Sequence, residues 1–257
     1  MKPRHAEIVD LLRAENAVAV HVLAQRMAVS ESTIRRDLTK LQKQGVLRRI
    51  HGGAFLEDDA QMEPPFELRA ISHQEEKDLV GRAAAEMVRD GEVIFIDGGT
   101  TTPFIVPYLA DRRGLTVVTC GLNVANALSR NPNIQTIVVG GELHIESQSF
   151  AGPLTQEALR AYDLRCDRAF IAAGGISAQH GVTNRILDRI PLKRQAMEIS
   201  RWVIVVADST KIGVAALGHV APIESIHALV TDPSAPPAEL AEIAARGVHI
   251  QIWNQAP

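Results

Sequence analysis

The sequence has few of the features that mark secreted, membrane or metal-binding proteins. Its 257 residues include only two cysteines, Cys120 and Cys166, which are too few and too far apart for a disulfide framework or a zinc site. The nine histidines lack the paired spacings of zinc ligands, so we expect no metal and no cofactor. No apolar run approaches the roughly 20 residues of a membrane span, and no charged-then-apolar signal segment is found. These absences predict a cytoplasmic protein without a membrane partner.

Length and charge together predict two domains. The chain is long for a single domain, and residues 1–55 hold ten Lys and Arg against five Asp and Glu, a net charge of +5. Because the whole chain has a net charge of −3, the remaining residues carry −8. This asymmetry assigns polyanion binding to the N-terminal part alone. We predict a head of residues 1–56, an acidic, proline-containing linker of residues 57–74, and a body of residues 75–257.

The head has the pattern of a helix-turn-helix. Apolar residues recur at helical spacing over residues 4–14 and, more briefly, over residues 22–27. After a tight turn, Ser30 is placed to cap a third helix. Two helices, a turn and a third helix make the motif that places its last helix in the major groove of DNA. Residues 46–55 then predict a wing hairpin around a Gly-Gly turn, with residues 18–20 as a candidate third strand.

The third helix separates its apolar and basic residues onto opposite faces. At about 100° per residue, Ile34, Leu38 and Leu41 fall on one side, and polar and basic residues fall on the other. A charge run of this kind is most often a solvated surface, and Asp37 is expected to pair with Lys40. The preceding helices, the turn and the wing favour DNA binding instead. The predicted DNA-binding residues are Ser30, Ser32, Thr33, Arg35, Arg36, Thr39, Lys40, Lys43, Arg48, Arg49 and His51.

Short apolar runs alternate with helical segments throughout the body. After a helix over residues 75–89, these runs cover residues 93–96, 115–120, 134–139, 169–173, 202–207 and 226–231. Strands without polar alternation predict a mainly parallel sheet covered on both faces, and therefore an α/β fold. Ligands of such sheets bind beyond the carboxyl ends of the strands.

The residues after these strands suit an anionic or polyhydroxylated ligand. The loop at residues 97–102 combines glycines, hydroxyls and a following helix N-terminus, which together can form a phosphate cradle, although Pro107 should shorten that helix. The loop matches neither a nucleotide P-loop nor the dinucleotide fingerprint, and a tight turn with threonine caps is the alternative. Of two lysine candidates, Lys211 is favoured over Lys193 because it follows a buried strand. The predicted ligand-binding residues are Asp97, Gly98, Gly99, Thr100, Thr101, Thr102, Cys120, Gly140, Gly141, Glu142, Gly174, Gly175, Lys193, Asp208 and Lys211.

Several motifs resemble those of the DeoR family of bacterial transcription regulators. They are TIRRDL at 33–38, RRIHGGA at 48–54, IDGGTTT at 96–102, LTVVT at 115–119, VVGGEL at 138–143 and VVADSTKIG at 205–213. The resemblance runs from about residue 4 to 232 and implies a winged helix-turn-helix that binds operator DNA. It also implies a body that resembles ribose-phosphate isomerase and coenzyme A transferase folds and senses a phosphorylated sugar or related metabolite. Family members are usually repressors of sugar or polyol operons, act as dimers or tetramers, and are released by the effector.

Two positions depart from the family pattern. Cys120 stands where many members have Asn, and Gly174 stands where many have Asp. By the resemblance, both positions would face the effector pocket. The effector of other family members is therefore not assigned to this protein. Activation of transcription stays an alternative to repression, because the sign of regulation depends on where the operator lies relative to the promoter. Sugar-phosphate isomerase activity is a further alternative, and it would need carboxylates that converge on one site. A fold shared with enzymes does not imply their activity. We therefore expect that the protein is not an enzyme.

Overall fold

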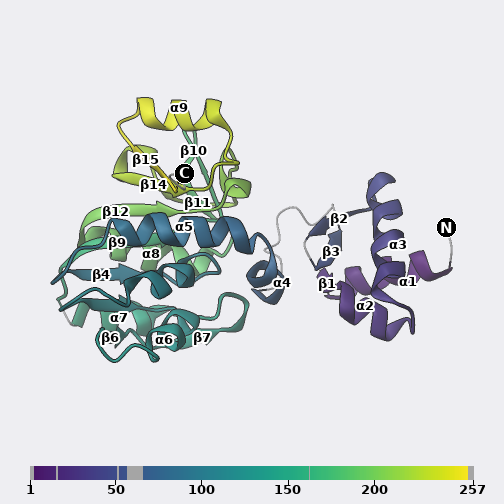
Figure 1. Cartoon of the computed structure of the whole chain (residues 1–257), viewed down its shortest axis with the longest axis horizontal. Helices are drawn as coiled ribbons and strands as arrows, with labels where there is room; N and C mark the ends of the chain where they lie inside the picture. Colours follow the sequence, from purple (N-terminus) through teal and green to yellow (C-terminus); the bar gives the residue numbers. More distant parts are fainter. Residues whose placement is uncertain (1–2, 16, 51, 57–65, 162, 254–257) are drawn as a thin grey trace. The chain divides into compact units, whose positions relative to one another are not determined.

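The chain folds into two compact units, Met1–Gln74 and Glu75–Pro257, in the computed structural model (Figure 1). The structure describes residues 3–15, 17–50, 52–56, 66–161 and 163–253. No helix within these ranges is both long and apolar enough to span a membrane.

The first unit is a winged helix-turn-helix, as the sequence predicts. Its elements are α1 (Pro3–Glu15), β1 (Ala17–Ala19), α2 (Val20–Arg26), α3 (Glu31–Lys43), β2 (Leu47–Ile50) and β3 (Gly53–Leu56). Because β3 pairs antiparallel with both β1 and β2, the predicted third strand of the wing is confirmed. Ser30 caps α3 as predicted, since its hydroxyl accepts a hydrogen bond from the N–H of Thr33 at 3.3 Å.

One face of α3 supplies the core of the first unit. Ile34, Leu38 and Leu41 are fully buried against Ile8 and Leu12 of α1. Burying each of these side chains contributes about 1.5–3 kcal/mol, so the helical pattern of apolar residues fixes which side of α3 faces inward. The polar side of α3 consequently faces solvent.

A helix lies within the segment that the sequence predicted to be a linker. α4 (Phe66–Ile71) falls inside that segment, and Gln74 begins α5 (Gln74–Glu86). A helix of six residues is too short to show a sustained apolar period, which is why the composition did not reveal it. Residues 57–65 lie outside the described part of the chain.

The second unit is built on a seven-stranded parallel sheet with the order β15-β14-β12-β9-β4-β5-β6. Its strands are β4 (Val93–Ile96), β5 (Thr116–Thr119), β6 (Gln135–Val138), β9 (Cys166–Ala172), β12 (Ser200–Val206), β14 (Ala228–Thr231) and β15 (His249–Ile252). All but β15 coincide with the predicted apolar runs. The predicted α/β fold with a parallel sheet is therefore confirmed.

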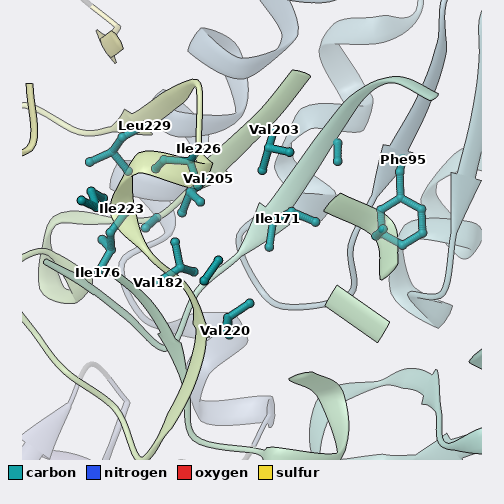
Figure 2. Close-up of a cluster of buried hydrophobic side chains, with 14 of the residues drawn as sticks. Phe95, Ile171, Ile176, Val182, Val203, Val205, Val220, Ile223, Ile226 and Leu229 are labelled. Atoms are coloured by element: carbon teal, nitrogen blue, oxygen red, sulfur yellow. The ribbon is translucent and has the colours of Figure 1, made fainter. Parts of the chain in front are cut away.

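Successive residues of the central strands point to opposite faces of the sheet, and both faces are covered. α5, η2 (Thr102–Leu109) and α6 (Leu122–Leu128) pack on the face that carries Ile94 and Ile96. α7 (Pro153–Ala161), α8 (Ile190–Glu198) and α9 (Pro237–Ala245) contribute to the core on the other face, which carries Phe95. Figure 2 shows this second cluster, in which sheet residues such as Ile171 and Val205 lie near Val182 of a smaller sheet.

Short elements follow the carboxyl ends of the sheet strands. The smaller antiparallel sheet has the order β10 (Gly175–Ser177), β11 (Gly181–Asn184) and β13 (Gly218–Ala221), and β7 (Glu142–His144) pairs with β8 (Ser149–Ala151). Four 3₁₀ turns complete the unit: η3 (Ile145–Ser147), η4 (Leu187–Arg189), η5 (Ser209–Lys211) and η6 (Ile223–Ser225). The sequence did not predict these strands, because three or four residues cannot show a reliable alternation.

Candidate functional site

The solvent-facing surface of α3 is basic. Arg36, Lys40 and Lys43 are exposed and have no ion-pair partner within the described part of the chain. Arg35 is exposed as well, but its Nη2 lies 2.9 Å from the carboxylate of Glu31, which neutralises part of its charge. Three unpaired cations on one face of a helix form a surface suited to a polyanion.

Hydroxyl groups gather at the start of α3. Ser30 Oγ lies 2.9 Å from Ser32 Oγ and 2.9 Å from Thr33 Oγ1, so three of the four predicted DNA-binding hydroxyls form one cluster. All belong to the first turn or the cap of the helix, where the N–H of Thr33 already donates to Ser30. This end of α3 can therefore donate hydrogen bonds to an anionic partner.

Two residues predicted to bind DNA connect the wing to α3. The Arg49 guanidinium donates a hydrogen bond to Thr39 Oγ1, and the Thr39 hydroxyl donates to the carbonyl of Arg35 at 2.7 Å. These bonds fix β2 beside α3. Arg48 is exposed on β2, and His51 lies outside the described residues.

Asp37 does not pair with Lys40, contrary to the prediction. It is buried against α1, where it accepts a hydrogen bond from Arg4 Nε at 2.7 Å, and His5 Nε2 lies 3.1 Å from its other oxygen. Burial raises the pKa of Asp37, but hydrogen bonds from His5 and Arg4 outweigh burial, and the pKa is lowered overall. Asp37 therefore anchors α3 to α1 and leaves Lys40 exposed.

A buried charge cluster lies beyond the carboxyl ends of β4, β5 and β9. Asp97 accepts hydrogen bonds from Arg189 Nη2 at 2.8 Å, from Lys193 Nζ, and from the N–H of Ala172 at 3.2 Å. The side chains of Asp97, Arg189 and Lys193 are all at least 96% buried. Cys120 is fully buried as well, with Sγ 3.7 Å from Asp97 Oδ1. The structure thus brings together three predicted ligand-binding residues and one arginine that was not predicted.

The cluster holds one carboxylate and two cations. Burial lowers the pKa of Lys193, and the nearby Arg189 charge acts in the same direction while Asp97 opposes it. The pKa of Asp97 is lowered despite burial, because Lys193 and Arg189 stabilise its charged form. When Lys193 is protonated, the cluster has one positive charge in excess. A bound anion would neutralise it, and buried charges without a counter-charge are costly.

The glycine loop before η2 passes directly beside this cluster. A Cβ on Gly98 would lie 2.6 Å from Ser149 Cβ and 3.2 Å from Arg189 Nη2, so the backbone approaches as closely as a glycine allows. Thr102 is fully buried, and its Oγ1 and Arg189 Nε have no hydrogen-bond partner among the residues that the structure describes. The helix after the loop is a 3₁₀ helix that contains Pro107, so the expected α-helical dipole is absent here.

A cavity of about 280 Å³ adjoins the charge cluster. Its lining residues come from the β7–β8 hairpin and the segment before η4, and they are Glu142, Leu143, His144, Ile145, Glu146, Ser147 and Ile186. Ser147 Oγ lies 2.8 Å from Ser149 Oγ, which in turn accepts a hydrogen bond from Arg189. A chain of hydrogen bonds therefore joins the wall of the cavity to the buried charges.

The two predicted lysines have different surroundings. Lys193 belongs to the buried cluster, where its Nζ also donates to the carbonyl of Ala172 at 2.6 Å. Lys211 ends η5 with a partly exposed side chain, and its backbone N–H donates to the carbonyl of Asp208. The structure thus ties Lys193 directly to Asp97, whereas the sequence favoured Lys211.

The other predicted ligand-binding residues occupy the same edge of the sheet. Asp208 caps η5 by accepting a hydrogen bond from the N–H of Thr210 at 3.2 Å. The remaining residues fall into three groups. Gly99, Thr101, Gly174 and Gly175 are buried, Thr100 is half-buried, and Gly140, Gly141 and Glu142 are exposed.

Sequence reasoning missed Arg189. The residue lies 92 positions from Asp97 in the chain and belongs to no motif that marks a ligand site. The one sequence feature that could have drawn attention to Arg189 is its position between a short strand, β11, and the helix α8.

A winged helix-turn-helix with a basic α3, joined to an α/β unit with a buried charged site, defines a DNA-binding regulator. The DeoR-like helix-turn-helix domain matches residues 4–59, and the DeoR C terminal sensor domain matches residues 72–233. The chain therefore belongs to the DeoR family of transcription regulators.

Relatives match over nearly the whole chain. The transcriptional repressor AccR of Agrobacterium fabrum is 35% identical over 233 residues, which cover 89% of this chain and 88% of that protein. The glycerol-3-phosphate regulon repressor of Escherichia coli is 31% identical over 249 residues, 97% of each chain. Among solved structures, ribose 5-phosphate isomerase A from Methanocaldococcus jannaschii is 14% identical, with a TM-score of 0.41 over 55% of each chain.

Proposed function

We propose that this protein represses a sugar or polyol operon and leaves its operator when a phosphorylated sugar or related metabolite binds the second unit. The observation that carries the proposal is the exposed basic surface of α3 within a winged helix-turn-helix, where Arg36, Lys40 and Lys43 have no ion-pair partner among the described residues. Its relatives named above are repressors, which supports this sign of regulation over activation.

In the DNA-bound form, α3 enters the major groove. Arg36, Lys40 and Lys43 divide base and phosphate contacts, while the hydroxyls at the start of α3 donate to the backbone. Arg48 adds contacts from the wing, and the Arg49–Thr39 bond holds the wing in register with α3. A homo-oligomer, a dimer or a tetramer, places two such helices on half-sites about one helical turn apart.

The effector binds at the carboxyl edge of the parallel sheet. Its phosphate neutralises the excess positive charge of Arg189 and Lys193 beside the Gly98–Thr102 loop. The adjoining cavity suits its hydroxyl-bearing part, because the carboxylates of Glu142 and Glu146 accept hydrogen bonds from hydroxyls and disfavour a second anion. The hydroxyls of Ser147 and Ser149 connect the two parts of the site.

Release requires that the effector favours a form of the protein that does not bind DNA. A ligand with equal affinity for both forms shifts nothing, whatever its affinity. We place the transmission of this change in the last part of the first unit, which includes α4 and leads into α5.

An isomerase function receives no support from the site. The enediol chemistry of an isomerase needs a carboxylate that is free to act as a base. Both oxygens of Asp97 are occupied by Arg189 and Lys193, and Asp208 accepts hydrogen bonds from the N–H and the hydroxyl of Thr210.

A mobility shift at fixed salt tests the proposal. The DNA upstream of the protein's own gene serves as probe, unrelated DNA of equal length as control, and sugar phosphates are compared with the same sugars without phosphate. We expect specific retardation that one phosphorylated compound abolishes and its unphosphorylated form does not. Retardation that is insensitive to every compound would contradict the sensor, and equal binding to both DNAs would contradict the operator function.

A further inference from the structure

A second cavity, of about 160 Å³, lies between α5, the end of η2 and the end of β15. It is lined by Arg82, Ala85, Glu86, Tyr108, Arg112 and Trp253. Tyr108 and Trp253 pack against the hydrophobic cluster that α5 covers, whereas Lys193 of the charge cluster lies on α8, on the other side of the sheet. No residue of this cavity belongs to the proposed effector site.

Two N–H donors in the walls of this cavity lack an acceptor. Arg112 Nε and Trp253 Nε1 are buried and have no hydrogen-bond partner within the described part of the chain. The Arg112 guanidinium is held in place by a hydrogen bond from Nη2 to the carbonyl of Ala85 at 3.2 Å. Because buried donors in native proteins are nearly always paired, this arrangement calls for an acceptor.

Arg82 and Tyr108, which also line the cavity, already have hydrogen-bond partners. Arg82 Nε donates to Tyr108 Oη at 2.8 Å and to Asp78 Oδ2 at 3.0 Å, and the Tyr108 hydroxyl donates to Asp78 Oδ1 at 2.6 Å. The Arg82 guanidinium also lies 5.0 Å from the centre of the Tyr108 ring. Asp78 therefore neutralises Arg82, and Arg112 is left without a carboxylate partner among the described residues.

We propose that this cavity is a second ligand site, which binds a small oxyanion through Arg112 and Trp253. Guanidinium and indole N–H groups only donate hydrogen bonds, and the planar guanidinium matches the two oxygens of a carboxylate or phosphate group. The exposed carboxylate of Glu86 at the rim disfavours larger, multiply charged ligands. A bound oxyanion connects α5 to the segment after η2 and to the end of β15.

The position of Trp253 supplies a direct test. The chain has two tryptophans, and Trp202, on β12, is 41% exposed and does not line this cavity. In the full-length Trp202→Phe protein, Trp253 emission is recorded while sodium phosphate or sodium acetate replaces sodium chloride at constant ionic strength. We expect a saturable change in emission that Arg112→Gln abolishes. Arg113→Gln is the matched control, because it removes the same charge from an exposed neighbour outside the cavity, and it should retain the change.

Several outcomes would overturn the proposal. They are no saturable change with either anion, an equal change in Arg112→Gln, or an equal loss in Arg113→Gln. If Arg112→Gln does not fold, as judged by circular dichroism, Arg112→Lys replaces it. That variant keeps the charge but loses Nε, so we expect at least tenfold weaker binding. If a sugar phosphate no longer releases Arg112→Gln from the operator, the cavity is itself the effector site. That result would overturn the proposal of a second, separate site.

Discussion

Arg4 on α1 and Asp37 on α3 form an ion pair between the two helices, with Arg4 Nε 2.7 Å from Asp37 Oδ2. The pair lies on the side of α3 that packs inward, and His5 adds a second contact to the same carboxylate. These contacts hold α3 against α1, so a buried acidic residue helps to set the orientation of the exposed basic surface of α3.

Replacing this carboxylate should loosen the first unit. We expect Asp37→Asn to lower its free energy of unfolding by about 1–3 kcal/mol, because Arg4 and His5 lose a charged acceptor. Lys40→Gln is the matched control and should leave stability unchanged. Thermal unfolding followed by circular dichroism measures both, and equal effects of the two variants would contradict the assigned pairing.

Acid should weaken the same contact. Because the pKa of Asp37 is lowered in the folded protein, its contribution to stability is present above its unfolded pKa of about 3.9 and is lost as the pH falls through the folded value. Asp37→Asn should lack this part of the acid dependence. Unfolding curves at a series of pH values below 5 give the free energy of unfolding of the variant and of the wild type. The same pH dependence in both proteins would exclude a contribution of Asp37 to acid sensitivity.

The basic surface of α3 should determine operator affinity. Arg36→Ala is expected to weaken specific binding by about 1–3 kcal/mol if Arg36 reads a base, or to reduce the salt slope by about one if it contacts a phosphate. Arg160→Ala removes an exposed arginine from the second unit and serves as control. Mobility shifts at several salt concentrations separate the two cases, and unchanged affinity and slope would remove Arg36 from the interface.

The proposed effector site should respond to pH through Lys193. Its lowered pKa means that the excess positive charge of the cluster disappears as the pH rises through the folded pKa, which lies below the ordinary lysine value of 10.5. Affinity for a phosphorylated effector should therefore fall as the pH rises toward the ordinary lysine pKa. Lys193→Met should show weaker binding with little pH dependence, whereas Lys211→Ala should keep the dependence. Calorimetric titrations provide the test, and the same slope in Lys193→Met would exclude Lys193.

Close packing of α5 on η2 should make Gly81 irreplaceable. A Cβ at this position would lie 2.2 Å from the backbone oxygen of Phe104, which cannot move like a side chain. We expect Gly81→Ala to destabilise the second unit by about 1–3 kcal/mol or more. Gly140→Ala is the control, since its Cβ would meet nothing within 4 Å. Chemical denaturation of both variants checks the difference.

Sequence alone was sufficient where a pattern is local. The period of Ile34, Leu38 and Leu41 located α3 and its buried face, and six apolar runs located six strands of the parallel sheet. The apolar run over residues 93–96 also placed the loop at residues 97–102 at the carboxyl end of a strand. Each of these signals lies within one element, so no knowledge of the tertiary fold was needed.

Long-range contacts set the limit of that reasoning. Asp37 finds its partners 32 and 33 positions away, and Arg189 meets Asp97 across 92 positions. A helical wheel favours a neighbour such as Lys40 because it cannot represent the helix packed behind it. The contact between Lys193 and Asp97 was not predicted for the same reason, since only the fold shows which lysine turns toward Asp97.

The surroundings of the two cysteines have a practical consequence. Cys120 and Cys166 are 0% and 3% exposed, and burial raises the pKa of each thiol to about 11. Since the thiolate is the form that oxidants and alkylating reagents attack, both should stay unreactive at neutral pH. A single thiol introduced on the outer side of α3, by Gln42→Cys, could then carry a fluorescent label that reports operator capture and release in real time.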